Sequence, residues 1–143
     1  MSASPEEDFA YFDVAADVGL EAWGRDLAGC FRQALRGVFN LIVPLQHVRP
    51  TEVRELQAQA EPAEVLLVAW LNEALYLHDV EGFVVHDLDR PRLSGLWAHA
   101  RLLGEPVDLL RHPRGTLVKA VTLHDLALRV TPERVMARLV LDI

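Results

Sequence analysis

Hydrophobic and polar residues alternate along much of the chain, and two longer stretches show helical spacing instead. Alternation with a period of two is typical of strands that bury one face. It predicts strands at residues 18–23, 52–60 and 96–102, at 82–88, at 116–130 with a break near His124–Asp125, and at 135–143.

The two stretches with helical spacing predict two helices. In the first, apolar residues recur on one face from Leu27 to Ile42, before Pro44. Asp26 precedes it, and its carboxylate can accept hydrogen bonds from the unpaired amides of the first turn. The second runs from about Pro62 to residue 78, and apolar residues nearly encircle it, so we expect it to be deeply buried.

This order of elements predicts an α+β fold. No internal repeat, linker or low-complexity run divides the chain. We therefore expect a single domain over residues 1–143, with one mixed β-sheet that carries both amphipathic helices on one face. Residues 1–8 are expected to be flexible.

Composition narrows the classes of function. The formal net charge of −7 over 143 residues argues against binding nucleic acid mainly through phosphate contacts, which require clustered Lys and Arg. The sequence shows no secretory signal, and its apolar runs are too short to span a bilayer, so we expect a cytoplasmic protein that binds no membrane. The single cysteine, Cys30, lies on an apolar helical face and is interpreted as an inert buried thiol.

Common catalytic motifs are absent from the sequence. There is no dinucleotide-binding glycine motif, no P-loop, no zinc-protease motif and no nucleophile elbow. The His–Asp dipeptides at 78–79, 86–87 and 124–125 are interpreted as ordinary polar pairs at turns or strand ends.

Three features could carry chemistry, and the first is an acidic connection between strands. Asp13 and Asp17 lie four residues apart in an otherwise apolar stretch. A solvated loop or an Asx-type turn would explain them. A divalent cation would also explain them, because it would remove their repulsion and hard cations select oxygen ligands.

The second feature is the C-terminal strand. Ile143 is in register with Leu139 and Leu141, so its side chain is expected in the core, where it would fix the terminal carboxylate beside Asp142. The alternative is a last edge strand with no further role.

The third feature is Lys119, which falls on the same face as Leu117 and Val121. Either its side chain is directed toward acidic residues, or it lies on an edge strand and blocks pairing with another sheet.

Five segments of the chain, in order and spacing, resemble the archease family. They are DVAADVGLEAWG (13–24), CFRQALRGVFNLI (30–42), WLNEALYLHDVEG (70–82), HPRGTLVKAVTLHD (112–125) and the final DI. The resemblance implies a protein cofactor of the RNA ligase RtcB. Such a cofactor promotes guanylylation and multiple turnover of the ligase in tRNA splicing or RNA repair, and meets RNA only through it.

The resemblance also implies a divalent metal ion, Ca²⁺, Mg²⁺ or Mn²⁺, held by oxygen ligands. Asp17, Asp142 and the carboxylate of Ile143 correspond to the metal ligands, and Asp13 and Lys119 to an accessory site. No residue is assigned a catalytic role, because the family acts as an activator and not as an enzyme.

The chain departs from the family pattern near this site. Val14 and Ala15 stand where the family usually has His and Thr, and Leu117 and Leu123 where it often has Glu and Tyr. Loss of groups that orient ligands can lower metal affinity about 10–100-fold.

Two other classes of function stay open. A free-standing metal-dependent phosphate-ester hydrolase would use the same acids, but the sequence offers it no evident nucleophile. A folding helper would present an exposed apolar patch.

Overall fold

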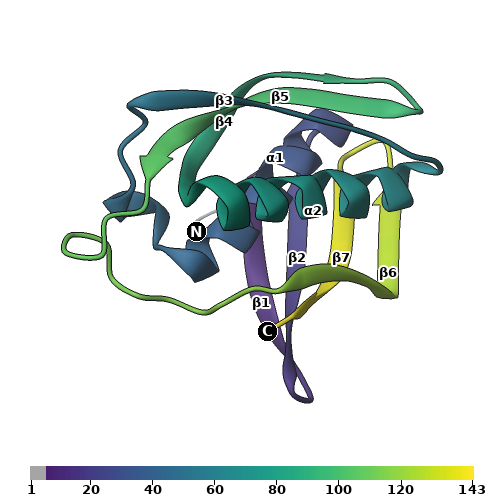
Figure 1. Cartoon of the computed structure of the whole chain (residues 1–143). Helices are drawn as coiled ribbons and strands as arrows, with labels where there is room; N and C mark the ends of the chain where they lie inside the picture. The colour runs from purple at the N-terminus through teal and green to yellow at the C-terminus, as the bar shows by residue number, and fades with distance from the viewer. Residues whose placement is uncertain (1–5) are drawn as a thin grey trace, which may run out of the picture.

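Two antiparallel sheets hold a pair of helices between them in the computed structural model, which describes residues 6–143 (Figure 1). A four-stranded sheet has the order β1-β2-β7-β6, and a three-stranded sheet the order β3-β5-β4. The helices are α1 (Leu27–Ile42) and α2 (Ala63–Glu81), with a short 3₁₀ helix η1 (Leu45–His47). The strands are β1 (Asp8–Val14), β2 (Asp17–Gly24), β3 (Glu52–Gln59), β4 (Phe83–Leu93), β5 (Trp97–Pro106), β6 (Ala120–Val130) and β7 (Val135–Asp142).

The α+β class is confirmed, but the prediction of one mixed sheet with both helices on one face is wrong. All five strand pairings are antiparallel, and they fall into two sheets that cover opposite sides of the helix layer. Alternation along one strand shows that it buries one face. It does not show which other strands share its sheet, because that depends on pairing between distant segments.

Helix α1 has the predicted boundaries. The Asp26 side chain accepts a hydrogen bond from the Gly29 amide at 2.8 Å and so caps the first turn, and the helix ends at Ile42, before Pro44. Its apolar face packs on β1, β2 and β7, and its other side contacts β4 of the second sheet. The helix therefore joins the two sheets.

Helix α2 is enclosed from several directions, which explains its nearly continuous apolar surface. It contacts β3, β4 and β5 on one side and β6 on the other. Gly82 ends it with a φ of 67°, a left-handed conformation that glycine adopts without steric cost. No helix within residues 6–143 is long and apolar enough to cross a bilayer.

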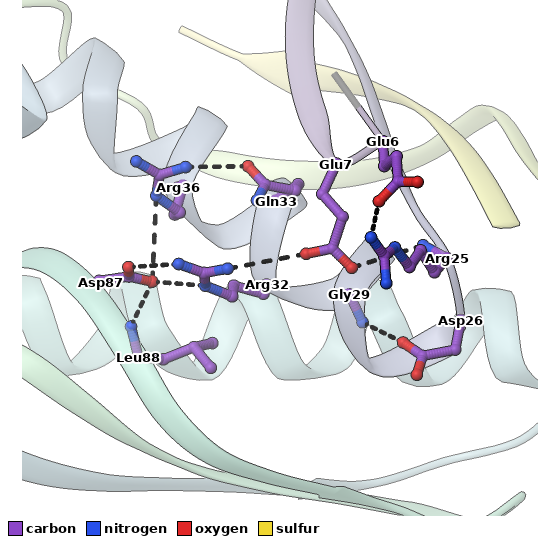
Figure 2. Close-up of polar contacts among 10 residues, drawn as sticks. All are labelled: Glu6, Glu7, Arg25, Asp26, Gly29, Arg32, Gln33, Arg36, Asp87 and Leu88. Atoms are coloured by element: carbon purple, nitrogen blue, oxygen red, sulfur yellow. Dashed lines mark hydrogen bonds and ion pairs between the residues drawn. The ribbon is translucent and has the colours of Figure 1, made fainter. Parts of the chain in front are cut away.

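An ionic network fixes α1 to β4 and to the start of the chain (Figure 2). Arg32 binds both carboxylate oxygens of Asp87, at 2.8 and 2.7 Å, and also lies 3.6 Å from Glu7. Burial alone would raise the pKa of Asp87, but the hydrogen bonds from Arg32 and the Leu88 amide, together with the charges of Arg32 and Arg36, outweigh it and lower the pKa. Arg25 pairs with Glu6 at the end of this chain of charges.

Three residues of the segment expected to be flexible have defined contacts: Glu6 and Glu7 form ion pairs, and Asp8 begins β1. Their flexibility itself stays a prediction. The rest of that prediction, residues 1–5, lies outside the described residues.

Candidate metal centre

The acidic connection is a two-residue hairpin turn between β1 and β2. Val14 pairs with Asp17, and Asp13 pairs with Val18, so Ala15 and Ala16 form the turn. Successive residues of a strand point to opposite faces. Asp13 and Asp17 therefore project from opposite faces of the hairpin, and their repulsion, which first suggested a cation, is relieved by the fold itself.

A different pair of acids is brought together. Val18 pairs with Leu141 across β2 and β7, so the next residues in this register, Asp17 and Asp142, lie opposite each other. Val18 packs against the core and Leu141 is fully buried in it. Asp17 and Asp142 therefore share the outer face of the four-stranded sheet, where two like charges directly opposite each other destabilise the pair.

The terminal residue lies beside this pair but is not anchored as expected. Pairing in β7 ends at Asp142, and the Ile143 side chain is 36% exposed and lies outside the core. The prediction that the Ile143 side chain is buried is therefore wrong. Ile143 is two residues after Leu141 and was therefore expected on the same side of the strand, but the apolar layer ends before the last residue. Figure 1 shows the chain end close to the β1–β2 hairpin.

Lys119 also lies near the chain end, but not on an apolar strand face. Strand β6 begins only at Ala120, and both Lys119 and Leu117 are exposed, whereas the Val118 between them is buried. Lys119 therefore shares the exposed side with Leu117, as predicted, but not with Val121, which is buried. The Lys119 amide donates a hydrogen bond of 2.7 Å to the Asp142 carbonyl, which places the residue beside the proposed ligands.

The donor chemistry at this sheet end fits a hard divalent cation. Asp17, Asp142 and the α-carboxylate of Ile143 supply only oxygen atoms, which Ca²⁺, Mg²⁺ and Mn²⁺ prefer. The set contains two acidic side chains, and no group of three or more His, Cys, Asp or Glu residues suited to a metal occurs within residues 6–143. The α-carboxylate is thus essential to any three-ligand site here. Asp13, on the other face of the hairpin, is a more distant acid.

A second polar cluster, which was not predicted, lies in the connection between β5 and β6. The carboxylate of Glu105 is buried and accepts hydrogen bonds from the Arg49 amide at 2.7 Å, from Arg111 and from Nε2 of His112 at 3.0 Å. Burial by itself raises the pKa of Glu105, but these donors outweigh it and lower the pKa to about 2. Nδ1 of His112 accepts from the Asp108 amide at 2.8 Å, so Nε2 carries the ring proton.

This cluster rigidly holds an apolar tip in solvent. The Asp108 carbonyl accepts from the amides of Arg111 and His112, and its side chain accepts from the Leu110 amide at 2.9 Å. Between these bonds, the side chains of Leu109 and Leu110 are 68% and 100% exposed. Signals for this cluster were present in the sequence as Glu105, Arg111 and His112, but their contacts depend on the tertiary fold.

The remaining candidate groups have structural roles. Nδ1 of His78 bonds the Phe83 carbonyl, and Nδ1 of His86 bonds the Leu45 carbonyl, while His124 pairs with the adjacent Asp125 on the surface. Cys30 is fully buried, and burial raises the pKa of its thiol to about 12, which makes it unreactive at neutral pH.

Comparisons with known proteins identify relatives over nearly the whole chain. Residues 9–143 match the model of the Archease protein family. The protein archease of Thermococcus gammatolerans is 35% identical over 138 residues, which cover 93% of this chain and 96% of that protein. The corresponding protein of Pyrococcus abyssi is 34% identical over 137 residues, again 93% and 96% of the two chains.

Solved structures show the same fold. The solution structure of a Methanobacterium thermoautotrophicum protein superposes with a TM-score of 0.80 at 31% identity, covering 94% of this chain and 98% of that one. A Thermotoga maritima structure described as an archease and possible chaperone gives a TM-score of 0.63 at 18% identity, covering 100% and 98%. The second likeness supports the fold alone.

Proposed function

The chain belongs to the archease family, and we propose that it is a protein cofactor that activates an RtcB-type RNA ligase. In this role it promotes guanylylation and multiple turnover of the ligase in tRNA splicing or RNA repair, and it is not itself an enzyme. The observation that carries this proposal beyond family membership is the rigid apolar tip at Leu109 and Leu110.

Single exposed apolar side chains are common on protein surfaces, but two adjacent leucines that project together offer a partner an apolar contact. The tip residues are held by the buried Glu105–Arg111–His112 cluster, so they lose little conformational entropy when a partner binds them. A pre-organised apolar projection of this kind supports a role as an interaction protein. We assign it as the contact with the ligase.

The charge of the chain supports the same partner. A ligase that holds RNA needs a basic surface, and a cofactor with a net charge of −7 is complementary to it. Complementary potentials accelerate the encounter of two proteins. They also predict that activation weakens as the salt concentration rises.

We further propose that Asp17, Asp142 and the Ile143 carboxylate hold a divalent cation, Ca²⁺, Mg²⁺ or Mn²⁺. Support comes from the placement of Asp17 opposite Asp142 and from the purely oxygen donor set. The ion supplies positive charge at the sheet end when it is bound. The carboxylates orient it, and Lys119 adds a second cation next to them.

A free-standing phosphate-ester hydrolase is the weaker alternative. Val14 lies next to Asp17 across the hairpin, so the position that could hold a general base carries an aliphatic side chain. Turnover of a phosphate ester by the purified chain with Mg²⁺ or Mn²⁺, lost in Asp17→Asn, would favour the enzyme. A folding helper would also use an exposed apolar tip, but it would protect unrelated unfolded proteins as well as the ligase.

The test is guanylylation of the ligase from the same organism, measured with and without this protein. We expect a faster rate with the wild-type chain and a loss of most of the increase with Leu110→Ser. Val130→Ser, which removes another strongly exposed aliphatic side chain, is the matched control and should keep full activity. An unchanged rate with the wild-type chain would contradict the proposed activator role.

A further inference from the structure

We propose a nucleotide-binding site on the outer face of the three-stranded sheet, at the end nearest the β4–β5 hairpin. A hollow of about 630 Å³ lies there, lined by Gln57, Ala58, Gln59, Arg92, Trp97, Ala98 and His99. The inference goes beyond the ligase-activating role, in which RNA is met only through the ligase. It also uses none of the residues assigned to the metal centre or to the apolar tip.

The register of the strands explains the hollow. Ala58 pairs with Ala98, and Ala98 is fully buried in the core, so the side chains of this row point inward and its backbone forms a floor. The rows on either side point outward. One row is Gln59 with Trp97, and the other is Gln57, His99 and Arg92.

The two rows leave a gap suited to a planar ring. Trp97 and His99 lie two residues apart on β5, so their Cα atoms are separated by about 6.6 Å along the strand. One aromatic ring fits between two side chains at this separation when their faces turn toward it. Trp97 is 39% exposed, so part of its side chain is open to a stacking partner.

The polar groups around the gap match the edge of a nucleobase. Gln57 and Gln59 each offer an amide donor and an acceptor, and Arg92 offers a cation for a phosphate. These three side chains make no hydrogen bond or ion pair with any other residue among 6–143. Hydrogen bonding to base edges, stacking and a guanidinium contact are the means by which proteins bind single-stranded nucleotides.

Charge favours a nucleotide over a cationic ligand. No acidic residue among those the structure describes lines the hollow, although the chain as a whole carries a net charge of −7. Glu55, the nearest acid on β3, is paired with His99 at 2.6 Å and so fixes that ring at the edge of the site. The ligand class is therefore a nucleotide, either free or as part of a single-stranded RNA.

Among residues 6–143, Arg92 is the only arginine or lysine that lines the hollow, so the site should depend on the base more than on phosphates. The logarithm of affinity should fall with the logarithm of salt concentration with a slope of about −0.7 or shallower. This distinguishes the site from a basic surface that attracts nucleic acid through many phosphates.

The experiment uses the full chain without the ligase, so its outcome is independent of the activator role. Guanosine and uridine monophosphates and a short single-stranded oligouridylate are titrated against the protein. The indole N–H resonance of Trp97, assigned by its loss in Trp97→Phe, locates binding in the wild-type chain, and calorimetry measures the affinity of every variant. A shift with monophosphates identifies a free nucleotide as ligand, and a shift with the oligomer alone identifies an RNA strand.

The variants test which groups carry the binding. We expect Trp97→Ala to weaken affinity about tenfold or more, since stacking on one aromatic side chain contributes that much. Trp97→Phe should keep most of the affinity, and Arg92→Gln should flatten the salt slope. Tyr76→Ala, which removes an exposed aromatic on α2, and Arg114→Gln, which removes an exposed cation, are the matched controls.

Two results would overturn the site. One is the absence of any shift with either kind of ligand. The other is an equal loss of affinity in Trp97→Ala and Tyr76→Ala. Gln57→Ala and Gln59→Ala provide a second test on exposed polar residues, in case Trp97→Ala fails to fold, and each should weaken binding while melting like the wild type.

Discussion

Asp17 and Asp142 lie opposite each other on β2 and β7, the two central strands of the four-stranded sheet, and both project from its outer face. The pair joins a residue near the start of the fold to one at its end. Without a cation the two charges oppose each other, and in the metal site proposed above they would become neighbouring ligands. The proposal therefore predicts that metal binding stabilises this sheet.

The first prediction concerns Asp17→Asn. In a chelator the substitution removes a like-charge contact, so the free energy of unfolding should stay the same or rise by about 0.2–1 kcal/mol. Added Ca²⁺ or Mn²⁺ should raise the melting temperature of the wild type but not of the variant. Asp79→Asn, an exposed acid on α2, is the control and should respond to metal like the wild type. Equal metal responses of all three proteins would exclude Asp17 as a ligand.

The second prediction concerns deletion of Ile143. The α-carboxylate moves back one residue, by about 3.3 Å, and onto the opposite face of the strand. Because the Ile143 side chain is more than a third exposed, its loss should cost less than about 1 kcal/mol of stability. Calorimetry should therefore show weaker metal binding by a chain that melts almost normally. Retained affinity would show that the terminal carboxylate is not a ligand.

The third prediction follows from the lowered pKa of Glu105. This pKa is about 2 in the folded protein against an ordinary value of 4.5, so the folded state favours the ionised form. The resulting stabilisation is fully present above about pH 5 and is lost as the pH falls from there toward 2. It amounts to about 3 kcal/mol at most.

Denaturant titrations between about pH 7 and pH 2 would measure this loss. In Glu105→Gln the free energy of unfolding should change less with pH over this window. The variant should also be less stable at neutral pH, because Arg111 and His112 lose their anionic partner. An unchanged pH profile in the variant would assign acid sensitivity to other carboxylates.

The fourth prediction tests the geometry of the hairpin turn. Ala16 has a φ of 65°, a left-handed conformation that costs a residue with a Cβ about 1–2 kcal/mol. Ala16→Gly removes this cost but adds flexibility to the unfolded chain, so the net gain should be about 0.5–1 kcal/mol.

Ala15→Gly is the matched control for that measurement. Ala15 is not among the residues with positive φ, so glycine there brings only the entropic penalty and should lower stability. Urea midpoints for the two variants should therefore move in opposite directions. Movement in the same direction would contradict the turn described here.

Local signals in the sequence were sufficient for the helices and for several boundaries. The cap at Asp26, the end of α1 before Pro44 and the role of Gly82 each depend on a few adjacent residues. The predicted break at His124–Asp125 is confirmed by a register shift between Thr122 and Ala127 and by the positive φ of Asp125. Such features follow from backbone chemistry within one or two turns of chain.

Features that depend on contacts between distant segments could not be predicted from local sequence patterns. The division into two sheets, the exposure of Ile143 and the burial of Glu105 against His112 follow from how the strands and loops come together. The acidic site was only partly accessible. The strand register places Asp17 opposite Asp142, as a shared site requires, and their role as metal ligands stays a prediction. Asp13, which was expected close by, lies on the other face of the hairpin.

The central place of β7 has a consequence for synthesis on the ribosome. Strand β7 follows the other strands in the sequence, yet it lies between β2 and β6, and within residues 6–143 β6 pairs with its sheet only through β7. A nascent chain can form α1, α2 and the three-stranded sheet before β7 is made. Until then β2 has no partner strand on the side where Leu20 and Ala22 later pair with β7. Products truncated before β7 would leave β6 without a partner strand, and such unpaired strands expose the chain to aggregation.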